Sequence, residues 1–182
     1  MKTESNVHYI ARLTITLLLI TAVVAALLAA VNSVTAPRIA AQNEEKTQAA
    51  VEAVLPGGGQ QVDYTDDTGL VGKVYKGGAG YAVEVMPSGF NGIVTMMVGV
   101  GTDGKVLGIS IVNHTETAGL GAVAAAQTTA GSTFRDQFVG MSGNVSVKKD
   151  GGQVDALTGA TITSRAVCSG VNAALSVAAA LG

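Results

Sequence analysis

The chain has 182 residues, of which 48% are hydrophobic and 13% charged, so it is long and apolar enough to fold around a core. Its formal net charge of −2 shows no basic surplus, which argues against nucleic-acid binding. Cys168 is the single cysteine, which excludes a disulfide framework, an iron–sulfur cluster and a cysteine zinc site within the chain. Redox chemistry in this chain therefore needs an organic cofactor.

Residues 1–12 are predicted to form an N-terminal tail and residues 13–36 a transmembrane anchor, because the second segment has no charged side chain. At 1.5 Å per residue, about twenty apolar residues of a helix span a hydrocarbon core of about 30 Å. A cleaved signal peptide is the alternative, because such peptides end at small residues and residues 25–30 are rich in alanine. We expect a retained anchor in the cell (inner) membrane.

The charges on the two sides of this segment predict its orientation. Basic residues at positions 2 and 12 precede it and acidic residues at 44 and 45 follow it, although basic residues at 38 and 46 reduce the contrast. Positive charge favours the cytoplasmic side of a membrane. The prediction is a single-pass protein whose larger domain is extracytoplasmic.

Residues 37–59 are predicted to form a linker helix between the anchor and a domain at residues 60–182. Pro37 is expected to begin this helix, since proline is favoured at the first helical position. Pro56 and the three glycines after it are expected to end the helix near Leu55.

Residues 71–112 are predicted to form an antiparallel sheet, because turn residues separate runs of β-branched residues. The expected strands are residues 71–75, 81–86, 93–100 and 106–112. Helical stretches are expected near residues 118–128 and 134–139, a short strand pair at 145–148 and 154–156, and a closing helix at 161–181. That last helix has too many Ser, Asn and Gly residues for a second membrane span. The predicted fold class is α+β, an antiparallel sheet with flanking helices after one N-terminal transmembrane helix.

The turn before the closing helix is the strongest chemical candidate. Unpaired backbone N–H groups and the positive end of the helix dipole favour a phosphate there, and Gly159 and Ala160 have too little bulk to exclude one. Plain helix capping explains the same residues, since Ser and Thr are common caps. Four hydroxyl side chains surround the turn, those of Thr158, Thr161, Thr163 and Ser164.

Residues 155–161 resemble the motif by which flavin transferases recognise FMN-binding domains, Asp155-x-x-Thr158-Gly159-Ala160-Thr161. The whole chain resembles the G subunit of Rnf-type electron-transport complexes, which is related to the C subunit of the sodium-translocating NADH:quinone oxidoreductase. Ala118 is a departure, because many members have proline there. The other matching segments are, in chain order, residues 54–56, Tyr81, residues 89–93 and residues 114–121.

This resemblance implies that Thr161 carries FMN as a phosphoester, transferred from FAD by a separate flavin transferase. It also implies an electron-transferring subunit of a translocase, not catalytic alone, in a membrane complex that couples electron flow between ferredoxin and NAD to ion translocation. The implied partners are the other subunits, the flavin transferase and the lipid bilayer. No catalytic residue or metal ligand is expected. The further cofactor-binding residues expected are Thr158, Gly159, Ala160, Thr163, His114, Glu116, Thr117, Gly119 and Leu120.

Four residues near these segments need an interpretation. Three of them have two alternatives, and the fourth has a structural role. His114 and Glu116 either hydrogen-bond the isoalloxazine edge and tune its potential, or hold their own turn through side-chain-to-backbone bonds. Arg165, four residues after the attachment threonine, either reaches the phosphodiester or is a solvated surface residue. Cys168 is interpreted as a small buried residue.

Two other functions compete with this interpretation. A non-redox, membrane-tethered surface domain would use the threonine turn only as a helix cap. An FMN-binding electron carrier of a different extracytoplasmic pathway would have the same domain and other redox partners.

Overall fold

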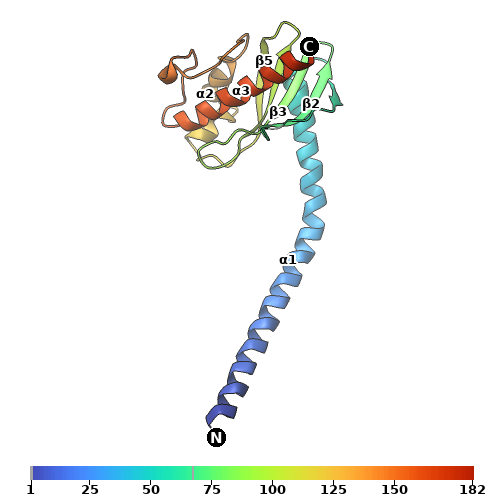
Figure 1. Ribbon diagram of the computed structural model, residues 1–182, viewed down its shortest axis with the longest axis vertical. Helices are drawn as coiled ribbons and strands as arrows, with labels where there is room; N and C mark the ends of the chain where they lie inside the picture. Colours follow the sequence, from blue (N-terminus) through green and yellow to red (C-terminus); the bar gives the residue numbers. More distant parts are fainter. Residues whose placement is uncertain (1, 67) are drawn as a thin grey trace. The chain divides into compact units, whose positions relative to one another are not determined.

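The computed structural model describes residues 2–66 and 68–182, with side chains from residue 7 onward. Two compact units make up the chain, Met1–Glu45 and Lys46–Gly182. Helix α1, Lys2–Val54, continues through Pro37 (Figure 1). The predicted helix start at Pro37 is therefore wrong. Proline removes a single backbone donor, and the helical bonds on both sides of it outweigh that local loss.

The first unit is part of one long helix whose described side chains, residues 7–45, are all exposed. Most of those between residues 13 and 34 are apolar, including a series of Leu, Ile and Val side chains that are about half exposed or more. The helix is long and apolar enough to cross a membrane. Apolar side chains exposed in this number are typical of a helix that an apolar surrounding covers, so this segment is a candidate membrane helix.

The second unit is built on a five-stranded antiparallel meander in the order β1-β2-β3-β4-β5. Strand β1 was not predicted. It has only three residues, and they show no alternation of apolar and polar side chains. The other four strands confirm the antiparallel sheet that the sequence predicts. The strands are β1 Gln60–Val62, β2 Val71–Gly77, β3 Gly80–Val85, β4 Thr95–Gly101 and β5 Val106–Asn113.

The two faces of this sheet are covered by helices at opposite ends of the sequence. Alternate residues such as Tyr81 and Val83 face helix α3, Thr161–Leu181, and share its buried core with Val171. The intervening residue Ala82 lies in a second cluster with Leu55 and the end of α1. Because successive side chains of a strand point to opposite faces of the sheet, each face packs against a different helix.

Helix α3 passes a length and composition test for a membrane span, but more than half of its apolar stretch is buried in the domain. Val167, Val171, Ala174 and Val177 are at most 2% exposed. It is therefore a core helix, and Figure 1 shows it lying across the sheet.

Between β5 and α3 the chain differs from the helical prediction for residues 118–128. The structure has a short 3-10 turn, η1 Gly121–Ala124, followed by helix α2, Thr129–Asp136, and a second 3-10 turn, η2 Lys148–Asp150. Thr128 caps α2 by accepting a hydrogen bond from the Gly131 N–H, so the helix starts after the predicted one ends. The predicted pair at 145–148 and 154–156 is reduced to one parallel bridge, Val147 with Val154.

Candidate functional site

The first turn of α3 starts without a side-chain cap. Its N-cap residue is Ala160, which has no side chain able to accept a hydrogen bond. The first backbone bond of the helix runs from the Ser164 N–H to the Ala160 carbonyl at 3.0 Å, so the N–H groups of residues 161–163 have no helical acceptor. Capping by these threonines, the alternative interpretation of the segment, is therefore not what the structure has. An uncapped helix start favours an anion.

Some hydroxyl groups of this turn are committed, that is, hydrogen-bonded within the fold, and others are uncommitted. Ser164 Oγ accepts from the Leu157 N–H at 3.0 Å and donates to the Ala160 carbonyl at 2.9 Å, which braces the turn. Thr163 Oγ1 donates to a carboxylate oxygen of Glu116 at 2.5 Å. In the described part of the chain the half-buried Thr161 hydroxyl has no hydrogen-bond partner. Among the three hydroxyls of the first turn of α3, only that of Thr161 is uncommitted.

A cavity of about 310 Å³ lies in front of Thr161. This volume is at the lower limit of ligand pockets, which run from about 300 to 1,000 Å³. Three large apolar side chains of its lining are also exposed to solvent, Phe90 at 67%, Leu120 at 43% and Ile162 at 48%. The site thus joins an uncapped helix start, which suits a phosphate, to apolar side chains, which suit an aromatic ring system.

Most of the predicted cofactor-binding residues line this cavity, and three do not. Phe90 and Ile162 were not predicted; their signal was a large apolar residue in a turn and at a helix start, where burial in the core is not expected. Gly121 completes the lining. The predicted residues that line the cavity are Glu116, Thr117, Leu120, Gly159, Ala160, Thr161 and Thr163, and those outside its lining are Thr158, His114 and Gly119.

The polar loop after β5 is held by its own hydrogen bonds. His114 Nδ1 accepts from the Glu116 N–H at 3.2 Å, so this ring nitrogen is an acceptor and the local bond is of the side-chain-to-backbone kind. Thr115 Oγ1 donates to the Asn91 carbonyl at 2.7 Å, and Asn91 Nδ2 donates to the Thr115 carbonyl at 2.7 Å. The loop and the connection between β3 and β4 are therefore tied together beside the cavity.

Two further residues of α3 have structural roles. Arg165 donates from Nε and Nη2 to both carboxylate oxygens of Asp150, at 2.7 and 2.6 Å. This hydrogen bond, with the added charge attraction, lowers the pKa of Asp150 and raises that of Arg165. Cys168 is buried, and burial raises the pKa of its thiol to about 11. The Arg165 guanidinium is thus committed to Asp150, and Cys168 is a packed thiol.

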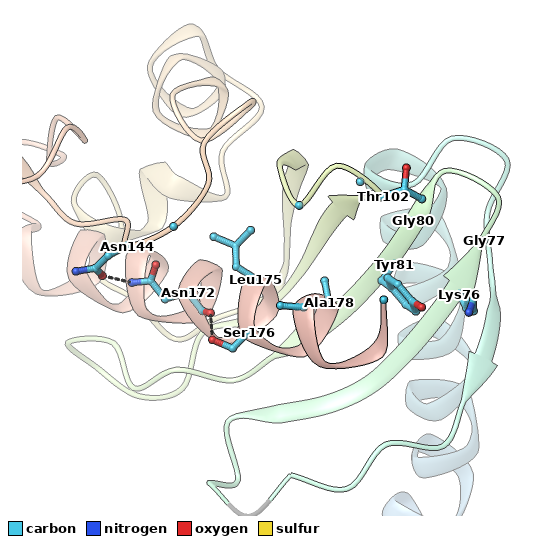
Figure 2. A pocket seen from close by; sticks show the side chains of 15 residues that line it. Lys76, Gly77, Gly80, Tyr81, Thr102, Asn144, Asn172, Leu175, Ser176 and Ala178 are labelled. Atoms are coloured by element: carbon cyan, nitrogen blue, oxygen red, sulfur yellow. Dashed lines mark hydrogen bonds between the residues drawn. The ribbon is translucent and has the colours of Figure 1, made fainter.

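A larger cavity, about 780 Å³, lies at the C-terminal half of α3 (Figure 2). The polar side chains that α3 contributes to its lining, and the Tyr81 hydroxyl, are already used within the fold. Asn172 Nδ2 donates to the Val145 carbonyl at 2.8 Å, Ser176 Oγ donates to the Asn172 carbonyl at 3.0 Å, and the Tyr81 hydroxyl donates to the Leu181 carbonyl at 2.7 Å. The smaller cavity, which combines the uncapped start of α3 with the unpaired Thr161 hydroxyl, is the better candidate for a cofactor.

Two family models match the chain. An FMN-binding domain matches residues 89–176, which include every residue that lines the smaller cavity, and an RnfG N-terminal region matches residues 1–54. The G subunit of the ion-translocating oxidoreductase complex of Methanosarcina acetivorans is 33% identical over 94% of this chain and 95% of its own length. The chain belongs to the RnfG family.

Other relatives in the RnfG family are named for complexes that translocate different ions. The G subunit of the sodium-translocating ferredoxin:NAD(+) oxidoreductase complex of Acetobacterium woodii is 32% identical over 97% of this chain and 95% of its own length. The proton-translocating counterpart of Clostridium ljungdahlii is 41% identical over 52% of this chain and 51% of its own. The chain is therefore an electron-transferring flavoprotein subunit of an ion-translocating membrane complex.

Proposed function

We propose that this RnfG chain holds FMN through a phosphoester to Thr161 and passes electrons within a complex that couples transfer between ferredoxin and NAD to ion movement. One observation carries the attachment site: the Thr161 hydroxyl is uncommitted at an uncapped helix start, while its neighbours Thr163 and Ser164 are hydrogen-bonded elsewhere. FMN bound here supplies the redox chemistry, and the protein supplies position and electrostatics.

The attachment reaction needs only a hydroxyl at this position and FAD brought by a flavin transferase. The Thr161 oxygen forms a bond to the phosphorus of the FMN half, the phosphoanhydride bond breaks, and AMP leaves. The hydroxyl proton passes to the departing phosphate or to solvent. The resulting phosphodiester carries one negative charge, and a negative charge at the start of a helix is stabilised by about 0.3–1 kcal/mol at exposed sites.

The residues of the cavity have distinct parts in this proposal. The N–H groups of residues 161–163, which have no helical acceptor, would be free to donate to an ester on Thr161. Phe90, Leu120 and Ile162 would offer apolar contact to the ring system, and their exposure would leave the site accessible to a neighbouring redox subunit. A covalent link keeps the cofactor in place in a site that is open to solvent.

Co-expression of the full chain with a flavin transferase tests the attachment. We expect a yellow protein whose fluorescent band survives a denaturing gel, and an intact mass larger by FMN less one water. Expression without the transferase is the control and should give no band. Thr161→Ala should abolish the band, whereas Thr158→Ala, at an exposed position, should only reduce the extent of modification. The reverse order of the two variants would refute the site.

We also propose a single-pass topology with the FMN domain on the extracytoplasmic side. The apolar helix α1 precedes the domain, and the basic residues at positions 2 and 12 precede the apolar stretch. A reporter enzyme that is active only outside the cytoplasm, fused after residue 182, should be active. Activity solely from a cytoplasmic reporter at the same position would refute the topology.

A further inference from the structure

Glu116 is a buried carboxylate that joins three separate segments of the chain. Its side chain is 8% exposed. One carboxylate oxygen accepts from the Asn91 N–H at 3.0 Å, and the other accepts from Thr163 Oγ1 at 2.5 Å. Asn91 lies between β3 and β4, Glu116 follows β5, and Thr163 is in the first turn of α3.

These three segments are the walls of the cavity in front of Thr161. Phe90 comes from the first segment, Leu120 from the second and Ile162 from the third. The first two walls are also joined by the reciprocal bonds between Asn91 and Thr115. Within the described residues, the bond from Thr163 to Glu116 is the only hydrogen bond between residues 114–121 and the first turn of α3.

Two glycines make room for this carboxylate. A Cβ atom at Gly121 would lie 2.6 Å from Thr163 Oγ1 and would overlap a Glu116 carboxylate oxygen. A Cβ atom at Gly89 would overlap the other oxygen. Any larger residue at either position would therefore displace the carboxylate, so the backbone on both sides is built closely around it.

Stability alone is a weak explanation for this arrangement. Removing a carboxylate from water is costly, and its hydrogen bonds offset only part of that cost. Apolar side chains of similar volume would close the same gap without a buried charge. A directional contact has a different effect, because it adds to the core packing of α3 a bond that fixes its first turn against the loop after β5. Residues two apart on a helix differ by about 200° in direction, so fixing Thr163 also fixes where Thr161 points.

We propose that Glu116 and Thr163 form a clasp that presents the Thr161 hydroxyl to the incoming FMN phosphate. Both are positioning residues, and the inference rests on the proposed attachment at Thr161. The clasp acts before any electron transfer, when the hydroxyl must face the transferred phosphorus. Its loss therefore slows attachment in the protein that does not yet carry flavin.

The test is the rate of flavin attachment to the purified full chain, expressed without a transferase and then incubated with flavin transferase and FAD. Thr163→Val keeps the shape and removes the hydroxyl, and attachment should slow at least tenfold. Thr163→Ser restores the hydroxyl and should recover a rate within about twofold of wild type. Ser176→Ala removes a hydroxyl from the other half of the same helix and should leave the rate unchanged. Rates are compared at a temperature where circular dichroism shows every variant folded.

Variants of Glu116 separate the contact from the charge. Glu116→Gln retains an acceptor for the Asn91 N–H and offers an amide to Thr163, so attachment should stay within about threefold of wild type. Glu116→Ala should be as slow as Thr163→Val, and the double variant no slower than either, because both remove one interaction. A Gln variant as slow as the Ala variant would overturn the clasp in favour of a role for the charge.

The outcomes also distinguish the two proposals. A wild-type chain that takes no flavin would refute the attachment at Thr161 itself. A wild-type chain that is modified while Thr163→Val is modified at the same rate would refute only the clasp.

Discussion

The two halves of α3 border cavities that differ in how the polar side chains of the helix are used. The N-terminal turn faces about 310 Å³ and has an unpaired hydroxyl and no side-chain cap. The C-terminal half faces about 780 Å³, and its Asn172 and Ser176 side chains are hydrogen-bonded within the fold. Volume alone would select the second cavity. Unsatisfied polar groups select the first, because a fold that leaves donors unpaired beside a cavity is suited to a polar ligand.

The comparison also separates stability from binding along one helix. Residues that complete their hydrogen bonds inside the protein contribute to the free energy of unfolding, and their removal leaves partners unpaired. Thr161 contributes little to such a network, so it is available to a cofactor. Substitutions at the two ends of α3 should therefore affect different measurements.

The largest expected effect is at Thr161. Thr161→Val keeps the shape of the side chain, and it should remove all covalent flavin because the attacking oxygen is gone. Thr161→Ser should retain it. The matched change at the other end, Ser176→Ala, should leave the flavin content at the wild-type level. In-gel flavin fluorescence per mole of protein measures all three, and flavin on the Val variant would break the comparison.

Asn172→Ala should show the opposite pattern. Asn172 accepts from the Val145 N–H at 2.8 Å and donates to the Val145 carbonyl at 2.8 Å, so its loss leaves both backbone groups without a partner. The free energy of unfolding should fall by about 1–3 kcal/mol. Denaturant titration measures this loss, while flavin per folded molecule should match wild type. A stable variant with little flavin would assign a binding role to the larger cavity.

Cys168, between the two ends, should behave as a buried core thiol. Its pKa is raised to about 11 by burial, so the folded protein holds the protonated form. The associated stability is present below about pH 9 and is lost as the pH rises towards 11, because the unfolded chain ionises first. A thiol reagent at pH 8 should label Cys168 only after unfolding. Rapid labelling of the folded chain would contradict this.

The smallest expected effect concerns Arg165. Its bonds lower the pKa of Asp150, so their stabilising contribution is present above about pH 4 and is lost as the pH falls through the lowered folded pKa. The melting temperature should therefore fall less for Arg165→Gln than for wild type when the pH is lowered from 6 to 3. Flavin attachment should not change. Reduced attachment would mean that Arg165 reaches the phosphodiester and leaves Asp150.

Much of the fold could be predicted because it depends on local patterns. Alternating β-branched residues and glycine-rich turns predict the strands, and the antiparallel sheet and α+β class are confirmed. Pro37 was misleading, since the rule for helix starts does not tell whether a helix already precedes the proline. Residues 118–128 were misleading as well, because alanine favours helices while the turn at Gly121 and the capping of α2 by Thr128 depend on neighbours elsewhere.

The sequence by itself pointed to the family, the apolar N-terminal helix and the turn that holds Thr161, because each depends on short runs of consecutive residues. Tertiary structure decided which hydroxyls of that turn are committed, since the partners of Thr163 and Ser164 depend on how the start of α3 meets the rest of the fold. It also brought Phe90 and Glu116 to the same cavity from separate strand connections. Hydrogen-bond partners distant in sequence leave no periodic signal, so only the folded chain shows which groups they satisfy.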